Sequence, residues 1–406
     1  MDRDYIWQAD YGNRRHLHSL QVHMSKLCET IGARPTGSAE NKAATDYAFE
    51  VLQKCGFETY RQEFDCINWR NFGAKLLLDD KNIPVESAEY ATPCDIQAYF
   101  ICVGTLEELQ RVELSGKILI LHGDLCNEPL MPKNFEFWNP DEHKQIIALL
   151  EEKSPKAIIT ASTQSEHIIQ DGDFNIPCAV INESELDAFL SSPNSIAKLI
   201  IDTERIPTRS CNVIASYGTG SDKVCLSAHI DTKPMTPGAL DNASGVSALL
   251  ALAEALAGKE LSFRIEIVLL NGEDYFSNPG EIIFMQGLKS EYRMAVNVDG
   301  VGLKGSPTSI SFYECEPQLE NQIMKLIETI ENFERVEPWP MGDHMIFAIC
   351  KIPTIAITAS EIFNLLETVI HSPEDDLGNI DFDVLGKIVQ LLIDCLETKS
   401  LGVLYT

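Results

Sequence analysis

From about residue 207 onward, short apolar strands alternate with helical segments, and this alternation constrains the fold more than any other feature of the chain. The predicted strands cover 224–230, 264–270, 294–299 and 353–358, and the predicted helices cover 243–258, 318–332 and 383–397. Strands and helices in this order form a largely parallel sheet with helices on both of its faces. We therefore predict an α/β domain with a mixed, mostly parallel central sheet flanked by helices.

Residues before 207 divide into two parts. Helical spacing of Leu17, Leu20 and Leu27 predicts a helix over 14–31, and a second helix over 39–55 ends at Gly56. From 66 to 206 the pattern changes to short β-like runs with one helical stretch near 142–152. We predict a β-rich module at 66–206, inserted into a domain that is formed by 1–65 and 207–406.

Composition excludes several classes of partner. The 406 residues include 61 Asp and Glu but only 32 Lys and Arg, so the formal net charge is −29. Nucleic acids and anionic membranes would repel such a chain, and we expect neither as a partner. The N-terminus lacks the pattern of a signal peptide, and the twelve cysteines form no C-x-x-C pair. We expect reduced, buried thiols in a cytoplasmic protein.

Acids and histidines gather at the predicted carboxyl ends of the strands. The candidates are His229, Asp231, Asp241, Glu273, Asp274, Asp299 and His371. Ligands of open α/β sheets bind at this edge. Imidazole and carboxylate donors suit zinc, with cobalt or manganese as alternatives, and the absence of thiolate argues against a purely structural zinc site. Two metal ions and a carboxylate acting as general base fit this inventory.

Simpler interpretations exist for each residue taken alone. Asp241 precedes a predicted helix and could serve only as its N-cap, and single histidines more often have structural roles. His122, His143 and His167 lie far apart in the inserted module, without acids or cysteines at ligand spacing, so we expect structural or solvated roles for them. The presence of acids and histidines at several separate strand ends is what favours a metal site.

Two other motifs do not support a function. Residues 300–305 fit G-x-G-x-x-G, but the stretch after them contains proline and β-branched residues and opens no helix. A dinucleotide pyrophosphate would therefore lack a helix N-terminus on which to bind. A G-x-S-x-G elbow for serine hydrolysis is also absent.

The motifs as a set resemble the di-zinc aminopeptidase family, which includes bacterial leucine aminopeptidases, glutamate carboxypeptidase, the glutaminyl cyclases and the non-catalytic transferrin receptor. The matching segments are Arg34-Pro-Thr-Gly-Ser38, His229-Ile-Asp231, Pro237-Gly-Ala-Leu-Asp241-Asn-Ala-Ser-Gly245, Asn271-Gly-Glu273-Asp274, Val298-Asp299-Gly300, Gly342-Asp343-His344 and His371-Ser-Pro-Glu-Asp375. They cover the N-terminal 60 residues and nearly all of 206–390.

The resemblance implies a role for each residue. His229 and Asp299 would hold one metal ion, Asp274 and His371 would hold the other, and Asp241 would bridge the two. Glu273 would be the general base, and Asp231 would support His229 or the base. The module at 66–206 occupies the place of the protease-associated domain that many members carry, which shields the cleft and contacts substrate.

We therefore predict a metallopeptidase, most simply an aminopeptidase that hydrolyses N-terminal residues of peptides. The alternatives are a single-zinc glutaminyl cyclase, a carboxypeptidase and a non-catalytic binding protein. Asp274 stands where the family more often has Glu, and residues 275–281 depart from the usual Gly-Leu-x-Gly-Ser run. These departures leave the number of metal ions and the substrate preference open. His344 is interpreted as a pocket or structural residue, not as a ligand.

Overall fold

The computed structural model describes residues 16–163, 167–288, 292–366 and 368–397. Two compact units emerge: unit 1 comprises residues 1–66 and 209–406, and unit 2 comprises residues 67–208. These boundaries lie one or two residues from the predicted ones. The first two residues of the helix predicted over 14–31, and the N-terminal residues that bear on a signal peptide, lie outside the described residues.

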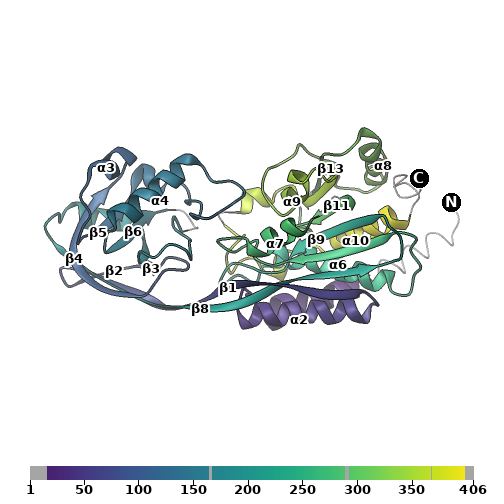
Figure 1. The fold of residues 1–406 in the computed structure, drawn as a ribbon, viewed down its shortest axis with the longest axis horizontal. Helices are drawn as coiled ribbons and strands as arrows, with labels where there is room; N and C mark the ends of the chain where they lie inside the picture. Colours follow the sequence, from purple (N-terminus) through teal and green to yellow (C-terminus); the bar gives the residue numbers. More distant parts are fainter. Residues whose placement is uncertain (1–15, 164–166, 289–291, 367, 398–406) are drawn as a thin grey trace. The chain divides into compact units, whose positions relative to one another are not determined.

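Unit 1 is built on a sheet in the order β13-β12-β14-β11-β9-β10-β8, and Figure 1 labels β13, β11, β9 and β8 of these strands. Its strands are β8 (Ile196–Tyr217), β9 (Lys223–His229), β10 (Arg264–Leu270), β11 (Tyr292–Val298), β12 (Thr308–Tyr313), β13 (Phe333–Arg335) and β14 (Thr354–Ala359). The central strands β14, β11, β9 and β10 are parallel, whereas β12 and β8 join them antiparallel. The predicted mixed, mostly parallel sheet is confirmed, and its parallel strands end at a common edge.

Helices pack on this sheet. They are α2 (Ala39–Lys54), α6 (Ser244–Leu256), α7 (Pro279–Gly287), α8 (Pro317–Ile327), α9 (His344–Ile349) and α10 (Phe382–Glu397). α6 packs against α2, α10 and strands β9 and β11, which explains why it is apolar around nearly its whole circumference. α9 packs against α7 and β14. α8 ends at Ile327, earlier than predicted, because the amides of Thr329 and Ile330 bond to carbonyls three residues before them instead of four.

Unit 2 contains more helix than predicted. Its remaining strands are β2 (Lys81–Ile83), β3 (Glu86–Ser87), β4 (Cys94–Val103), β5 (Ile118–Leu121), β6 (Ala157–Ser162) and β7 (Cys178–Asn182), and its helices are α3 (Leu106–Arg111), α4 (Asp141–Lys153) and α5 (Leu186–Leu190). β4 to β7 are parallel neighbours. Parallel pairing requires crossover connections, and α3 and α4 lie in two of them. The role of this unit as a protease-associated lid stays a prediction.

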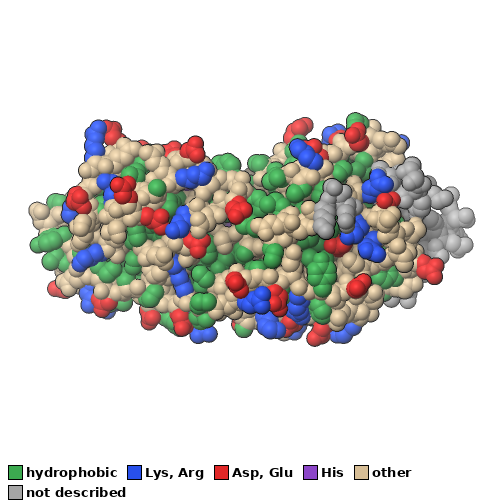
Figure 2. Space-filling model, viewed as in Figure 1, with side chains coloured by type: hydrophobic (Ala, Val, Ile, Leu, Met, Phe, Trp, Pro, Cys, Tyr) green, Lys and Arg blue, Asp and Glu red, His purple; other side chains and the backbone are tan. Residues whose placement is uncertain are grey.

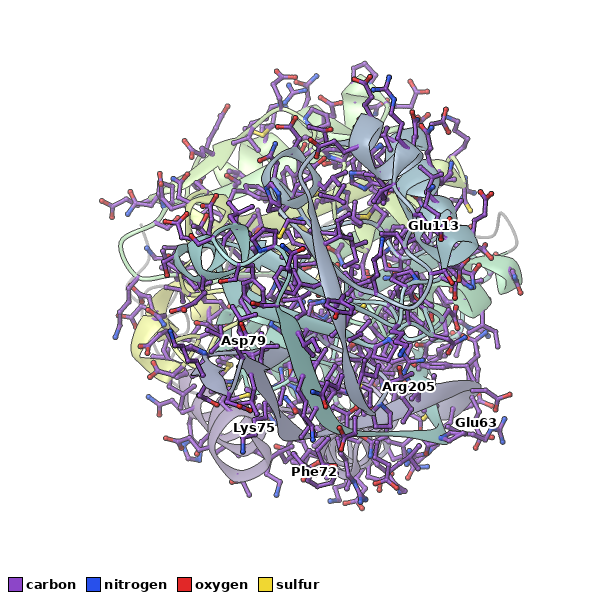
Figure 3. All side chains as sticks on the ribbon, turned by 90° about the vertical axis from the view of Figure 1, so that its left-hand side faces the viewer. Glu63, Phe72, Lys75, Asp79, Glu113 and Arg205 are labelled. Atoms are coloured by element: carbon purple, nitrogen blue, oxygen red, sulfur yellow. The ribbon has the colours of Figure 1, made fainter. Side chains whose placement is uncertain are left out.

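Long strands carry the chain between the units, and polar contacts hold the unit 2 part of these strands. β1 (Glu58–Leu78) and β8 contain residues of both units. Arg205 of β8, labelled in Figure 3, donates to the backbone carbonyls of Tyr90, Gly172 and Phe174. Asp79, at the end of β1, accepts a hydrogen bond from the amide of Ile196. Arg205 thus connects β8 to two loops of unit 2.

The acidic excess does not gather into one patch on the face drawn in Figure 2, where acidic and basic side chains are interspersed. Among the described residues, no helix is both long enough and apolar enough to cross a bilayer.

Cysteine reactivity tests this fold. All twelve cysteines are free, and burial raises the pKa of Cys28 and of Cys126 to about 12. Because the thiolate is the reactive form, native Cys28 and Cys126 should resist iodoacetamide at pH 8, whereas the part-exposed Cys350 should react first. Peptide mapping by mass spectrometry measures the order, with urea-unfolded protein as the control. Early labelling of Cys28 in the native protein would contradict the packing.

Candidate metal centre

The site forms where the parallel strands of unit 1 end. His229 is the last residue of β9, Glu273 and Asp274 follow β10, and Asp299 follows β11. Two further residues come from loops. Asp241 lies in the turn before α6, and His371 lies in the loop after β14, with a φ of +61°. Parallel strands present their carboxyl ends at one edge, which brings these sequence-distant residues together.

Asp241 occupies the centre of the cluster. Its Oδ1 lies 2.9 Å from Nε2 of His229, and its Oδ2 lies 3.0 Å from Nε2 of His371. Asp299 approaches the first histidine, with 3.4 Å between its Oδ1 and Nε2 of His229. Asp274 approaches the second, with 3.1 Å between its Oδ1 and Nε2 of His371. The two oxygens of one carboxylate therefore face two separate histidine and aspartate pairs.

This geometry suits metal ions better than hydrogen bonds. His229 is fully buried, yet neither of its ring nitrogens has a hydrogen-bond partner of acceptable geometry among the described residues, although Asp241 is near. Asp274 is also buried, and its Oδ2 is equally unsatisfied. Buried polar atoms without partners are costly. One donor atom each from His229, Asp241 and Asp274 lie within 4.8 Å of one another, so a cation could satisfy them together.

Electrostatics favour a cation at the same place. Burial lowers the pKa of His229, but the carboxylates around it, Asp299 first, outweigh burial and raise that pKa well above its ordinary value. Burial raises the pKa of Asp274, and the charge of Asp241 raises it further. A buried cluster with more acids than histidines carries negative charge that divalent cations would neutralise.

Glu273 lies beside the proposed ligands without being paired to a histidine. Burial raises its pKa well above the ordinary value, and the negative charges of Asp274 and Asp343 add to this effect, whereas His229 opposes it. A glutamate with a raised pKa can accept a proton and return it near neutral pH. This is the property that a general base of hydrolysis requires.

Asp231 lies on the Nδ1 side of the His229 ring, away from the Nε2 atom that faces Asp241. Its Oδ1 is 3.7 Å from Nδ1 of His229, and its Oδ2 accepts a hydrogen bond of 2.8 Å from the hydroxyl of Thr36. The backbone amide of Gly272, which precedes Glu273, also bonds to Asp231. Asp231 thus connects the strand end that carries His229 to the segment that carries the base.

Two positioning residues, Arg34 and Asp375, had no assigned role in the sequence analysis. Arg34 is fully buried, and its guanidinium donates to the carbonyls of Ile230, Pro237 and Gly238 at 2.7–3.1 Å. These carbonyls belong to the loop between His229 and Asp241. Arg34 therefore holds the loop that joins two of the proposed ligands. Its place in a matching motif was visible in the sequence, but its partners were not.

Asp375 holds Asp241 from the other side. Its carboxylate accepts hydrogen bonds from the amides of Leu240 at 2.8 Å and Asp241 at 3.1 Å. Asp375 is itself fully buried. The backbone of the central aspartate is thus fixed by a residue that lies four positions after His371, so both proposed ligands depend on one loop.

His344 is not part of the cluster. Its Nε2 lies 3.0 Å from the carbonyl oxygen of Trp339, and its ring packs on Tyr313 with 4.6 Å between centroids. Burial lowers its pKa. These contacts support the structural interpretation of His344.

The chain is similar to a known protein family and to several known proteins. Residues 212–396 match the model of peptidase family M28. This segment, slightly less than half of the chain, is similar to that family. The match covers the strands and loops that carry all of the proposed ligands.

Two solved structures and one curated sequence are similar. The fold resembles a zinc aminopeptidase from Bacillus subtilis, with a TM-score of 0.74 and 19% identity over 94% of this chain and 95% of the other. It resembles a glutaminyl cyclase from Bacteroides thetaiotaomicron less, with a TM-score of 0.53 and 16% identity over 94% of this chain and 97% of the other. The protein named "probable lipoprotein aminopeptidase LpqL" from Mycobacterium tuberculosis is 26% identical over 60% of this chain. The chain spans 50% of the length of that relative.

Zinc binding tests the cluster without an activity assay. Adding zinc to chelator-treated protein should raise its unfolding temperature, because an ion that binds only the folded state stabilises that state. When the zinc concentration is a hundred times its Kd, the free energy of unfolding rises by about 2.7 kcal/mol. Asp241→Ala should remove most of this shift, since it deletes the carboxylate that faces both His229 and His371. Asp222→Ala, which removes a partner of Arg293 outside the cluster, is the matched control. Equal shifts in both variants would contradict the site, and differential scanning fluorimetry makes the measurement.

Proposed function

We propose that the protein is a two-metal aminopeptidase that removes N-terminal residues from peptides, with zinc as its metal. The orientation of Asp241 supports this proposal most directly, since its two carboxylate oxygens face two different histidines. Each proposed metal ion then has one histidine and one aspartate of its own in addition to Asp241: His229 and Asp299 for one ion, His371 and Asp274 for the other. A pair of ions about 3.5–4 Å apart, bridged by one carboxylate, is the arrangement used for metal-assisted hydrolysis.

Asp274 is long enough for its proposed role. The sequence left open whether this shorter side chain could serve where glutamate is more common. Its Oδ1 lies 3.1 Å from Nε2 of His371, so the aspartate is long enough to bring its oxygen beside the histidine nitrogen that would bind the same ion. This contact supports two metal ions over the single zinc of a cyclase.

The chain's own residues would then share the chemistry as follows. Bound zinc would lower the pKa of water to about 7 and polarise the peptide carbonyl. Glu273 would take the proton from the attacking water and deliver it to the nitrogen of the leaving peptide. Asp231 would hold the ring of His229 in one orientation through its Nδ1. Thr36 would keep Asp231 in place.

An aminopeptidase fits the surroundings better than a carboxypeptidase. A carboxypeptidase must bind the carboxylate of its substrate, normally with a cation. Arg34 lies close to the loop of Asp241, but it is fully buried and its N–H groups bond to backbone carbonyls. It therefore has no group to offer a substrate. The acids of the cluster suit the positive charge of a free N-terminus, and the similar curated protein is named an aminopeptidase.

Replacing the base tests this function. Glu273→Gln should lower kcat for release of N-terminal residues by about 10²–10⁴-fold, because the amide cannot accept the proton of water. The zinc content and the zinc-induced rise in unfolding temperature should stay unchanged. Glu314→Gln, which alters an exposed ion pair with Lys351, is the control and should keep full activity.

The substrates separate the competing functions. Purified, zinc-loaded protein would be offered peptides with free N-termini, acetylated N-termini, amidated C-termini and N-terminal glutamine. Cleavage of free and amidated peptides alone supports an aminopeptidase. Loss of cleavage on amidation indicates a carboxypeptidase, and ammonia release from N-terminal glutamine indicates a cyclase. Either of the last two results would overturn the proposal.

A further inference from the structure

Two buried carboxyl groups lie together outside the proposed ligand set. Glu281 belongs to the first turn of α7, and Asp343 directly precedes α9. Their exposed fractions are 4% and 0%. Helices α7 and α9 pack against each other, and each carboxyl group acts on the other: Asp343 lowers the pKa of Glu281, and Glu281 raises the pKa of Asp343. The chemistry proposed above gives neither of them a role.

This contact requires a proton. Two ionised carboxylates offer only acceptors, so they cannot bond to each other unless one of them is protonated. Neither oxygen of Asp343 receives a hydrogen bond from an N–H or O–H group of the described residues. Burial raises the pKa of Glu281 to about 8 and that of Asp343 well above its ordinary value. Both shifts favour one proton on the pair at neutral pH.

Asn278 connects the pair to the base. The side-chain amide of Asn278 donates to the backbone carbonyl of Glu273 at 3.1 Å and also to Oε2 of Glu281. Asn278 is buried and has a left-handed backbone, with a φ of +43°. Its own carbonyl accepts from the amide of Ile282. The turn from Glu273 to Asn278 is thus tied to α7 through one carboxyl group.

We propose that Glu281 and Asp343 share one proton and that this carboxyl pair, acting through Asn278, positions the segment that carries Glu273. Both are positioning residues, since they reach the base only through Asn278. Glu281 lies in the stretch that departs from the family's usual Gly-Leu-x-Gly-Ser run. The catalytic part of the inference rests on the proposed function.

Three substitutions separate positioning from simple packing. Glu281→Gln keeps an acceptor for Asn278 and supplies an N–H donor to Asp343, so it imitates the protonated acid. Glu281→Leu keeps the volume but removes both bonds. Glu266→Gln is the matched control, because Glu266 is also buried in unit 1 and bonds to Tyr292 away from the cluster.

The expected result is a split between kcat and KM. Glu281→Leu should lower kcat by about 10²-fold, since small displacements of a catalytic group cost this much, while KM changes less than about threefold. Glu281→Gln should restore kcat to within about threefold of the wild type, and Glu266→Gln should leave it unchanged. Wild-type kcat in Glu281→Leu, or no rescue by glutamine in a folded protein, would overturn the positioning role.

Infrared spectroscopy tests the shared proton without any activity. The zinc-loaded wild type at pH 7 should show the carbonyl band of a protonated carboxyl group, and both Glu281→Gln and Asp343→Asn should lose it. A wild-type spectrum without this band would overturn the inference even if the enzyme is active. Conversely, an inactive wild type that shows the band would refute the proposed function but leave the carboxyl pair standing.

Discussion

The candidate site depends on the position of the Asp241 carboxylate between two histidines. Its two oxygens face His229, at the end of β9, and His371, in the loop after β14. Buried acids without compensating positive charge would repel one another and destabilise the fold. The two divalent cations proposed above, each held by one histidine and sharing Asp241, would offset this repulsion and supply the electrophile that hydrolysis needs.

The surrounding backbone is organised to hold that one side chain. Asp375 bonds to the amide of Asp241, and Arg34 bonds to the carbonyls of the loop before it. Thr36 reaches Asp231 behind His229. Arg34 and Thr36 lie outside the segment that matches the family model. Arg34 and Thr36 therefore support the candidate metal centre, although neither of them is a proposed ligand.

The sequence predicted the sheet and the candidate ligands because both follow local patterns. β10 occupies the predicted span, and the acids follow strands whose carboxyl ends must meet. Less local features escaped prediction. Helix α7 begins at Pro279 and Gly280 after a turn that shows no helical periodicity. The partners of Arg34 and the contact of Glu281 with Asp343 link residues far apart in the chain, and a single sequence carries no record of such pairings.

A crystal structure of the zinc-loaded protein, with anomalous scattering recorded at the zinc edge, would locate the ions. We expect two peaks about 3.5–4 Å apart, one beside His229 and Asp299 and the other beside His371 and Asp274. Asp241 should bridge them with one oxygen on each. A single peak, or two peaks that do not share Asp241, would contradict the account.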